Sequence, residues 1–147
     1  MNLRAFLENA APDYLGRMLS DIWQLTDDEM ETCHDYIQCV FPLDQESGAV
    51  PNAPVLTKED MADIKSSPVA ISNLKQSAQW FYQFLCRNDQ WLAPANHNHL
   101  RITRLIKSLR LLVGDAFADE MRMKILRLAE NSGARINTLT LEFWMHS

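Results

Sequence analysis

The chain contains few turn-forming residues and has no long apolar run. Only 4 of its 147 residues are glycine and 6 are proline, which disfavours a β-sandwich, a fold with a turn every few residues. No window approaches the roughly 18 consecutive apolar residues of a membrane-spanning helix. Glu8 lies where a signal peptide would have its apolar stretch, so a secretory leader is not expected.

Cysteine and positive charge are also scarce. The three cysteines, Cys33, Cys39 and Cys86, form no CxxC pair, and an odd count is not typical of a secreted disulfide scaffold. The formal net charge of -5 disfavours a protein that coats nucleic acid through its overall charge. Together these features predict a cytoplasmic protein.

Motifs that indicate catalysis or metal binding are absent from the sequence. The sequence has no GxSxG, HExxH, P-loop or glycine-rich dinucleotide pattern. Cys33 and His34 are adjacent, but adjacent side chains on a helix point about 100° apart and do not form a nucleophile–base pair. His97 and His99 have no third metal ligand nearby. We therefore expect no catalytic residue, metal or cofactor; a small-molecule enzyme using His34, His97 or His99 remains a second alternative.

The apolar residues that are present follow a helical pattern. Hydrophobic residues make up 47% of the chain and charged residues 22%, enough for a core without metals or disulfides. Apolar positions recur three and four residues apart from end to end, and no alternating strand pattern stands out. We expect an all-α fold, with residues 1–147 forming a single domain built as an irregular bundle of about six to eight helices.

Capping residues predict where the helices begin and end. A central helix follows Ser67, and residues 42–54 form the one long loop. Asn98 is expected to cap a basic helix that ends before Gly114, and Asp115 to cap the next. The remaining helices are predicted near residues 3–7, at 12–22, at 26–41, after Thr57 and around 139–144.

The basic helix carries an unusual charge concentration. Its cations are Arg101, Arg104, Lys107 and Arg110; removing them from the 14 basic residues leaves 10 against 19 acidic ones. One interpretation is a site for phosphate, an acidic peptide or nucleic acid. The other is a solvated helix face that complements the acidic residues at 27–31. We favour the solvated face, because runs of charge usually face solvent.

Seven polar residues are the candidates for ligand or partner binding. Either they surround a cavity and form a site, or they bond to one another and hold the long loop on the bundle as a structural lock. We favour the lock, because buried polar groups near helix starts normally satisfy the backbone first. The candidates are His34, Gln38, Asn96, His97, His99, Arg101 and Arg104.

Several stretches together carry a family resemblance. Residues 34–43 (HDYIQCVFPL), 51–54 (PNAP), 96–104 (NHNHLRITR) and 107–112 (KSLRLL) resemble the conserved domain of the opioid growth factor receptor family. The ends, PDY at 12–14 with GR at 16–17, and TLEFW at 140–144, are similar to the short stand-alone bacterial members. The resemblance covers nearly the whole chain. The chain departs from the family at Cys39, where a bulky aromatic is common, and in a short segment between Arg87 and Pro94.

The resemblance implies receptor-like binding of a peptide, since the animal members are described as receptors for an enkephalin peptide. It supplies no catalytic residues. The function expected here is a peptide- or protein-binding module in which the loop 42–54 and residues 96–104 form one recognition surface. The alternative is phosphate or nucleic-acid binding through residues 101–110.

Overall fold

The computed structural model describes residues 1–133 and 135–147, and within them it is all-α, which confirms the predicted irregular helical bundle. Nine α-helices and one 3-10 helix are found in this part of the chain, without a strand. The helices are α1 (Leu3–Leu7), α2 (Leu19–Ile22), α3 (Asp27–Thr32), α4 (Ile37–Val40), α5 (Lys58–Lys65), α6 (Pro68–Arg87), η1 (Gln90–Leu92), α7 (Asn98–Leu112), α8 (Asp115–Asn131) and α9 (Thr138–Met145).

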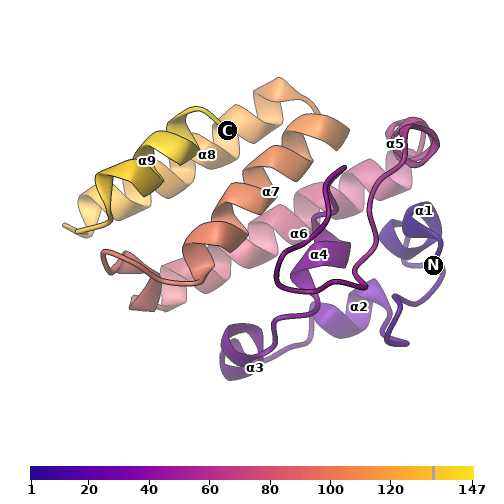
Figure 1. Cartoon of the computed structure of the whole chain (residues 1–147), viewed down its shortest axis with the longest axis horizontal. Coiled ribbons are helices and arrows are strands. Elements are labelled where there is room, and N and C mark those ends of the chain that lie inside the picture. The colour runs from indigo at the N-terminus through magenta and orange to yellow at the C-terminus, as the bar shows by residue number, and fades with distance from the viewer. Residues whose placement is uncertain (134) are drawn as a thin grey trace.

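The long helix α6 runs through the middle of the molecule (Figure 1). It contacts α1 and α5 from the first half of the chain and α7 and α8 from the second. In Figure 1, α1, α2 and α3 lie on one side of it and α5 lies beside its N-terminal end, whereas α8 and α9 lie on the other side; α9 packs on both α7 and α8. Helix α7 therefore has the N-terminal helices on one flank and α9 on the other.

Helix α6 forms where its cap and its apolar spacing predict. The Ser67 hydroxyl accepts from the Ala70 amide at 3.1 Å, and Pro68 occupies the first turn, where its missing amide hydrogen costs nothing. Leu74 and Phe81 are completely buried. Each such side chain contributes about 1.5–3 kcal/mol by leaving water, which makes α6 the centre of the core.

The helix predicted over residues 26–41 is broken, and this part of the prediction is wrong. Helix α3 ends at Thr32 and α4 begins at Ile37, with Cys33 in an extended conformation (φ -80°, ψ 128°). The break lets Tyr36 become fully buried and donate from its hydroxyl to the Met30 carbonyl at 2.7 Å. Met30, Ile37, Val40 and Phe41, which share the apolar spacing, are buried, but they lie on or next to two short helices instead of one long one.

The helix predicted over residues 12–22 is also mostly wrong, because only Leu19–Ile22 is helical. Asp13 accepts from the amides of Leu15 and Arg17, both at 2.9 Å, and its own amide donates to the Arg17 carbonyl. A short polar side chain that binds nearby amides competes with helix formation. Residues 13–17 consequently form a tight turn.

The predicted caps of α7 and α8 are displaced by one or two residues. Asn98 is the first residue of α7, and its amide donates to the Asn96 side chain at 2.9 Å, so Asn96 performs the capping. Helix α8 follows Gly114, whose backbone angles (φ 126°, ψ 164°) belong to a region that only glycine adopts readily. Gly114 thereby allows α8 to turn back against α7.

Replacing Gly114 tests the α7–α8 junction. A Cβ built at Gly114 meets nothing within 4 Å, so Gly114→Ala adds backbone strain without a clash. We expect the free energy of unfolding to fall by about 1–3 kcal/mol in urea denaturation. Gly48→Ala is the control, because Gly48 also has open space around it but no positive φ. Equal unfolding midpoints for the two variants would contradict this account.

Candidate functional site

Arg101 of α7 holds the segment between α3 and α4. Its side chain is buried, with 5% of the residue surface exposed. Nη1 donates to the Met30 carbonyl at 2.6 Å and to the Asn98 side chain at 3.1 Å, while Nη2 donates to the Cys33 carbonyl at 2.6 Å. One guanidinium thus supplies donors to the carbonyls that the end of α3 leaves without helical partners.

The ring of Tyr36 completes the surroundings of this guanidinium. The guanidinium carbon of Arg101 lies 5.4 Å from the ring centroid, and Nη1 lies 3.3 Å from the hydroxyl oxygen. Burial raises the pKa of Tyr36 above its ordinary value, so the phenol stays neutral and keeps donating to the Met30 carbonyl. Arg101, Tyr36 and the carbonyls of Met30 and Cys33 are called the Arg101 network below.

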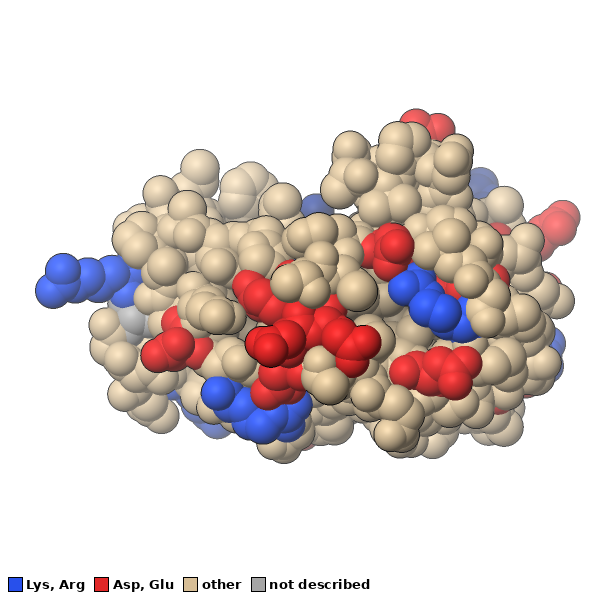
Figure 2. All heavy atoms as spheres, turned by 90° about the horizontal axis from the view of Figure 1, so that it is seen from below, with Lys and Arg blue, Asp and Glu red and all other residues tan. Residues whose placement is uncertain are grey.

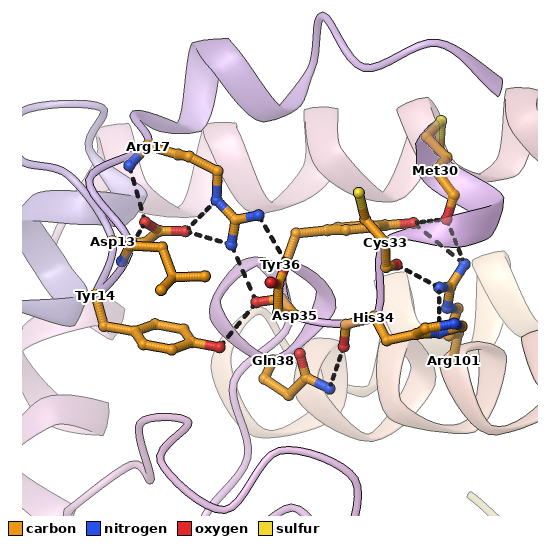
Figure 3. Close-up of polar contacts among 11 residues, drawn as sticks. Asp13, Tyr14, Arg17, Met30, Cys33, His34, Asp35, Tyr36, Gln38 and Arg101 are labelled. Carbon is orange, nitrogen blue, oxygen red and sulfur yellow. Dashed lines mark hydrogen bonds and ion pairs between the residues drawn. The ribbon is translucent and has the colours of Figure 1, made fainter. Parts of the chain in front are cut away.

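A second arginine secures the same segment from the other side (Figure 3). Arg17 forms ion pairs of 2.8 Å with both Asp13 and Asp35, and its Nη2 donates to the Asp35 carbonyl at 3.1 Å. The Tyr14 hydroxyl donates to that carbonyl as well. The segment 33–38 is therefore held between the turn at residues 13–17 and helix α7.

The next turns of α7 continue the attachment. Arg104 donates to the carbonyls of Phe41 at 2.8 Å and Gln38 at 3.2 Å, and the Ser108 hydroxyl donates to the Pro42 carbonyl at 2.8 Å. Burial lowers the pKa of Arg104 to about 10, so the guanidinium remains charged near neutral pH. The chain from α4 to the start of the long loop is thus tied along one face of α7.

These contacts overturn the prediction of a solvated cationic face. Arg101 is buried, Arg104 is partly buried, and Arg110 forms ion pairs with Asp115 at 2.9 Å and Asp119 at 2.7 Å. Lys107 alone of the four cations is exposed. The spacing of these residues correctly predicts one helix, but the side chains of Arg101 and Arg104 extend inward to backbone carbonyls.

The acidic helix α3 does not balance the cations of α7 in the way predicted. Asp27 instead pairs with Arg87 of α6 at 2.9 Å. Helix α3 lies at the lower edge of Figure 1, and the molecule seen from below shows acidic side chains gathered in a central patch (Figure 2). The protein therefore presents an acidic face beside α3.

His34 and His97 lie together at the surface. Their ring centroids are 5.4 Å apart in an edge-to-face arrangement, and both residues are exposed. His97 Nε2 lies 3.0 Å from a Glu31 carboxylate oxygen, and the Asn98 side chain donates to the other oxygen. His34 Nδ1 lies 3.3 Å from Arg101 Nη2. The two histidines thus cover the outer side of the Arg101 network.

His99 belongs to a different part of the molecule. It is buried, its Nε2 lies 2.6 Å from the Trp91 carbonyl oxygen, and its ring meets the Trp144 ring edge-on at 5.5 Å. Trp91 is itself buried and donates to the carbonyls of Leu85 and Asn88. His99 therefore connects α7 to η1 and α9.

Five of the seven candidate residues line one pocket, called the α7 pocket below. Its volume is about 530 Å³. Helix α7, the segment 34–38 and the long loop form its walls, whereas Asn96 and His99 do not line it. The lining residues are His34, Ile37, Gln38, Leu43, Glu46, Ser47, Gly48, Ala49, His97, Leu100, Arg101, Thr103, Arg104 and Lys107.

Sequence reasoning did not select Leu100 or Lys107, although both line the pocket. Leu100 is the most exposed of the large apolar residues described, at 77%. The signal in the sequence was a large apolar residue on the polar half of an amphipathic helix. Such a side chain gains no free energy from contact with water, so it is a candidate for contact with a ligand. The seven candidate residues thus show both expected features. Several bond to one another, as the structural lock predicts, and five also border a pocket, as a binding site would.

Gln38 has an unusual hydrogen-bonding state in the pocket wall. Its Nε2 donates to the His34 carbonyl at 3.0 Å, which fixes the orientation of the amide. Its Oε1 is buried and has no partner among the residues that the structure describes. An unpaired buried acceptor costs about 1–3 kcal/mol. Gln38 is therefore a candidate contact for a ligand that brings a donor.

Two further findings bear on the kind of site. Within residues 1–133 and 135–147, no group of three or more His, Cys, Asp or Glu side chains is placed to hold a metal ion. No helix of the described chain is long and apolar enough to span a membrane. The arrangement provides hydrogen-bonding and apolar contacts for a ligand.

Comparison with known proteins identifies the family. The family model described as "Opioid growth factor receptor (OGFr) conserved region" matches residues 2–147. The chain belongs to the opioid growth factor receptor family. The stretches 34–43 and 96–104 are the ones that the Arg101 network and the α7 pocket bring together.

Individual members of the opioid growth factor receptor family show moderate identity. Opioid growth factor receptor-like protein 1 of Mus musculus is 29% identical over 170 residues, covering 99% of this chain and 36% of the relative. The opioid growth factor receptor of Rattus norvegicus is 33% identical over 115 residues, covering 64% of this chain and 20% of the relative. The chain thus spans about a third or less of these relatives. No solved structure matches.

Arg101→Ala tests the importance of the Arg101 network for stability. Removing the guanidinium leaves the carbonyls of Met30 and Cys33 without their donor, so we expect a loss of about 3 kcal/mol or more in urea denaturation. Arg101→Lys should rescue little, because an ammonium lacks the planar fork of donors. Lys107→Ala, on the exposed side of the same helix, should change the free energy by about 0.5 kcal/mol or less. An unaltered midpoint for Arg101→Ala would refute the assignment.

Proposed function

We propose that residues 1–147 form a single receptor-like domain that binds a peptide or a segment of a partner protein in the α7 pocket. The observation that supports this proposal is the composition of the pocket. Its walls come largely from stretches that carry the family resemblance, above all 34–43 and 96–104, and the loop residues 46–49 complete them. The names of the relatives, which describe receptors, agree with a binding role.

The lining of the α7 pocket suits a peptide. Apolar side chains from three elements, Ile37, Leu43 and Leu100, face it together with the polar groups of His34 and Gln38. Binding pockets in proteins typically combine an apolar lining with a few placed polar groups that orient the ligand. A volume of about 530 Å³ holds a few side chains of a bound segment, within the usual range for ligand sites.

The two alternatives receive less support. Phosphate or nucleic acid would need free cations, but Arg101 and Arg104 already donate to carbonyls and Arg110 is paired with two aspartates. An enzyme using the three histidines would need them in one place, and His99 lies apart from His34 and His97. Binding of a peptide or a protein is therefore the function that we propose.

The location proposed for this activity is the cytoplasm. Cys33, Cys39 and Cys86 are all free, which is typical of a reducing compartment. Burial also raises the pKa of the Cys39 thiol to about 12, so this thiol is protonated at neutral pH and serves as a small apolar side chain of the core.

A display selection tests the proposed function. The chain is immobilised and a random-peptide library is selected on it, and the enriched peptides are measured by fluorescence anisotropy against wild type and Leu100→Asp. We expect peptides that bind the wild type and lose about tenfold or more in affinity for Leu100→Asp, because a carboxylate replaces an exposed apolar contact. Val69→Asp, at an apolar residue of α6 that is 53% exposed, is the control. The proposal fails if no peptide is enriched, or if both variants bind like wild type.

Gln38→Met separates a binding role from a structural one. The change keeps the side-chain volume, loses one hydrogen bond and removes the unpaired acceptor, so the free energy of unfolding should change by about 1 kcal/mol or less. Peptide affinity should fall, because the ligand's donor loses its acceptor. Denaturation and anisotropy measure the two effects. A strongly destabilised variant with unchanged affinity would show that Gln38 serves the fold alone.

A further inference from the structure

We infer that the ligand of the α7 pocket is an acidic peptide whose chain continues across α7 into a second hollow beside α9. This inference rests on the proposed function and specifies the class of ligand. It is carried by three observations: the wall of α7 residues that the two hollows share, the exposed apolar side chains around the second hollow, and the sign of the charges between the two.

The two hollows adjoin each other across α7. The second has a volume of about 360 Å³ and lies between α7 and α9. It shares Leu100, Thr103 and Lys107 with the α7 pocket, while Leu139 and Phe143 line its α9 side. A bound segment that leaves the α7 pocket over Leu100 therefore enters the second hollow directly.

Exposed apolar side chains mark this route. Leu100 is 77% exposed, Leu139 61% and Phe143 56%, and all three line the second hollow. Single exposed apolar residues are ordinary, but a group around one depression is typical of an interaction site. Helix α9 is rich in apolar residues, and only Trp144 among them is fully buried. The route thus offers contact area for apolar side chains of the ligand.

The charges along the route favour a negatively charged occupant. Lys107 lies at the junction of the two hollows and forms no ion pair with the described residues. The guanidinium groups of Arg101 and Arg104 also line the α7 pocket; they donate to backbone carbonyls, but neither forms an ion pair with a carboxylate among the described residues, so they add to the positive potential there without being free to bind phosphate. Three acids lie near them: Glu46 lines the α7 pocket, Asp44 lines an adjoining hollow with Lys107, and Glu31 is engaged by His97.

The negative charge on the rest of the molecule increases the contrast with the positive charge along the route. The chain has a net charge of -5, and acidic side chains gather on the face beside α3 (Figure 2). An acidic segment is repelled from that face, whereas Lys107 is an exposed cation at the junction of the two hollows. The occupant that fits is a peptide with an Asp or Glu at Lys107 and bulky apolar residues on either side, one for each hollow.

Peptides from the display selection test this inference. Anisotropy titrations compare wild type with Lys107→Glu at the junction and Phe143→Ser in the second hollow. The matched controls are Lys65→Glu, an exposed lysine of α5, and Met123→Ser, an exposed apolar residue of α8. All four changes are at the surface, and circular dichroism verifies that each variant is folded.

The expected result has three parts. The enriched peptides contain more Asp and Glu than the library; each test variant weakens binding about tenfold whereas the controls do not; and replacing the acidic residues of the peptide by Asn and Gln weakens binding to a similar extent. Binding also weakens as salt is raised, because Lys107 is exposed to solvent.

Other outcomes overturn the inference in distinguishable ways. Peptides that lose affinity for Leu100→Asp but not for Phe143→Ser, and show no acidic preference, would leave the proposed function intact and refute the acidic, two-hollow ligand. Selection of no peptide at all would refute both. Displacement of the peptides by a DNA oligonucleotide that binds more tightly would assign the surface to nucleic acid and refute the inference.

Discussion

The burial of the Arg101 guanidinium against the end of α3 is the interaction on which the rest of this structure depends. When the chain leaves the helix at Cys33, the carbonyls of Met30 and Cys33 lose their helical donors, and Arg101 supplies them at 2.6 Å each. The same contact places His34 and Tyr36 on α7. A buried charge that is hydrogen-bonded on several sides stabilises one arrangement, since any other leaves it unpaired.

The remainder of the site follows from that contact. Once the segment 33–38 is fixed on α7, Arg104 and Ser108 hold the chain as far as Pro42, and the long loop begins directly beside the helix. The loop residues 46–49 then form the outer wall of the α7 pocket. Residues that hold the chain on α7, Arg101 and Arg104 among them, therefore also line the pocket, an arrangement that gives the proposed binding site a rigid support.

Family membership and site geometry contribute different kinds of knowledge. The match over residues 2–147 assigns the opioid growth factor receptor family, but the relatives are about three to five times longer than the segment they share with this chain. Function belongs to the site that a fold carries. Here the three arginines of α7 are engaged within the protein, whereas Lys107, Leu100 and Phe143 stay exposed.

The sequence by itself determined the fold class, the central helix α6 and the helix starts at Thr26 and Thr57, because caps and apolar spacing act over three or four residues. It also singled out five residues of the α7 pocket without showing that they meet. Only the tertiary structure decided the break at Cys33 and the inward direction of Arg101 and Arg104. Arg101 and Met30 are 71 positions apart, and the free energy of such a contact is absent from any local pattern.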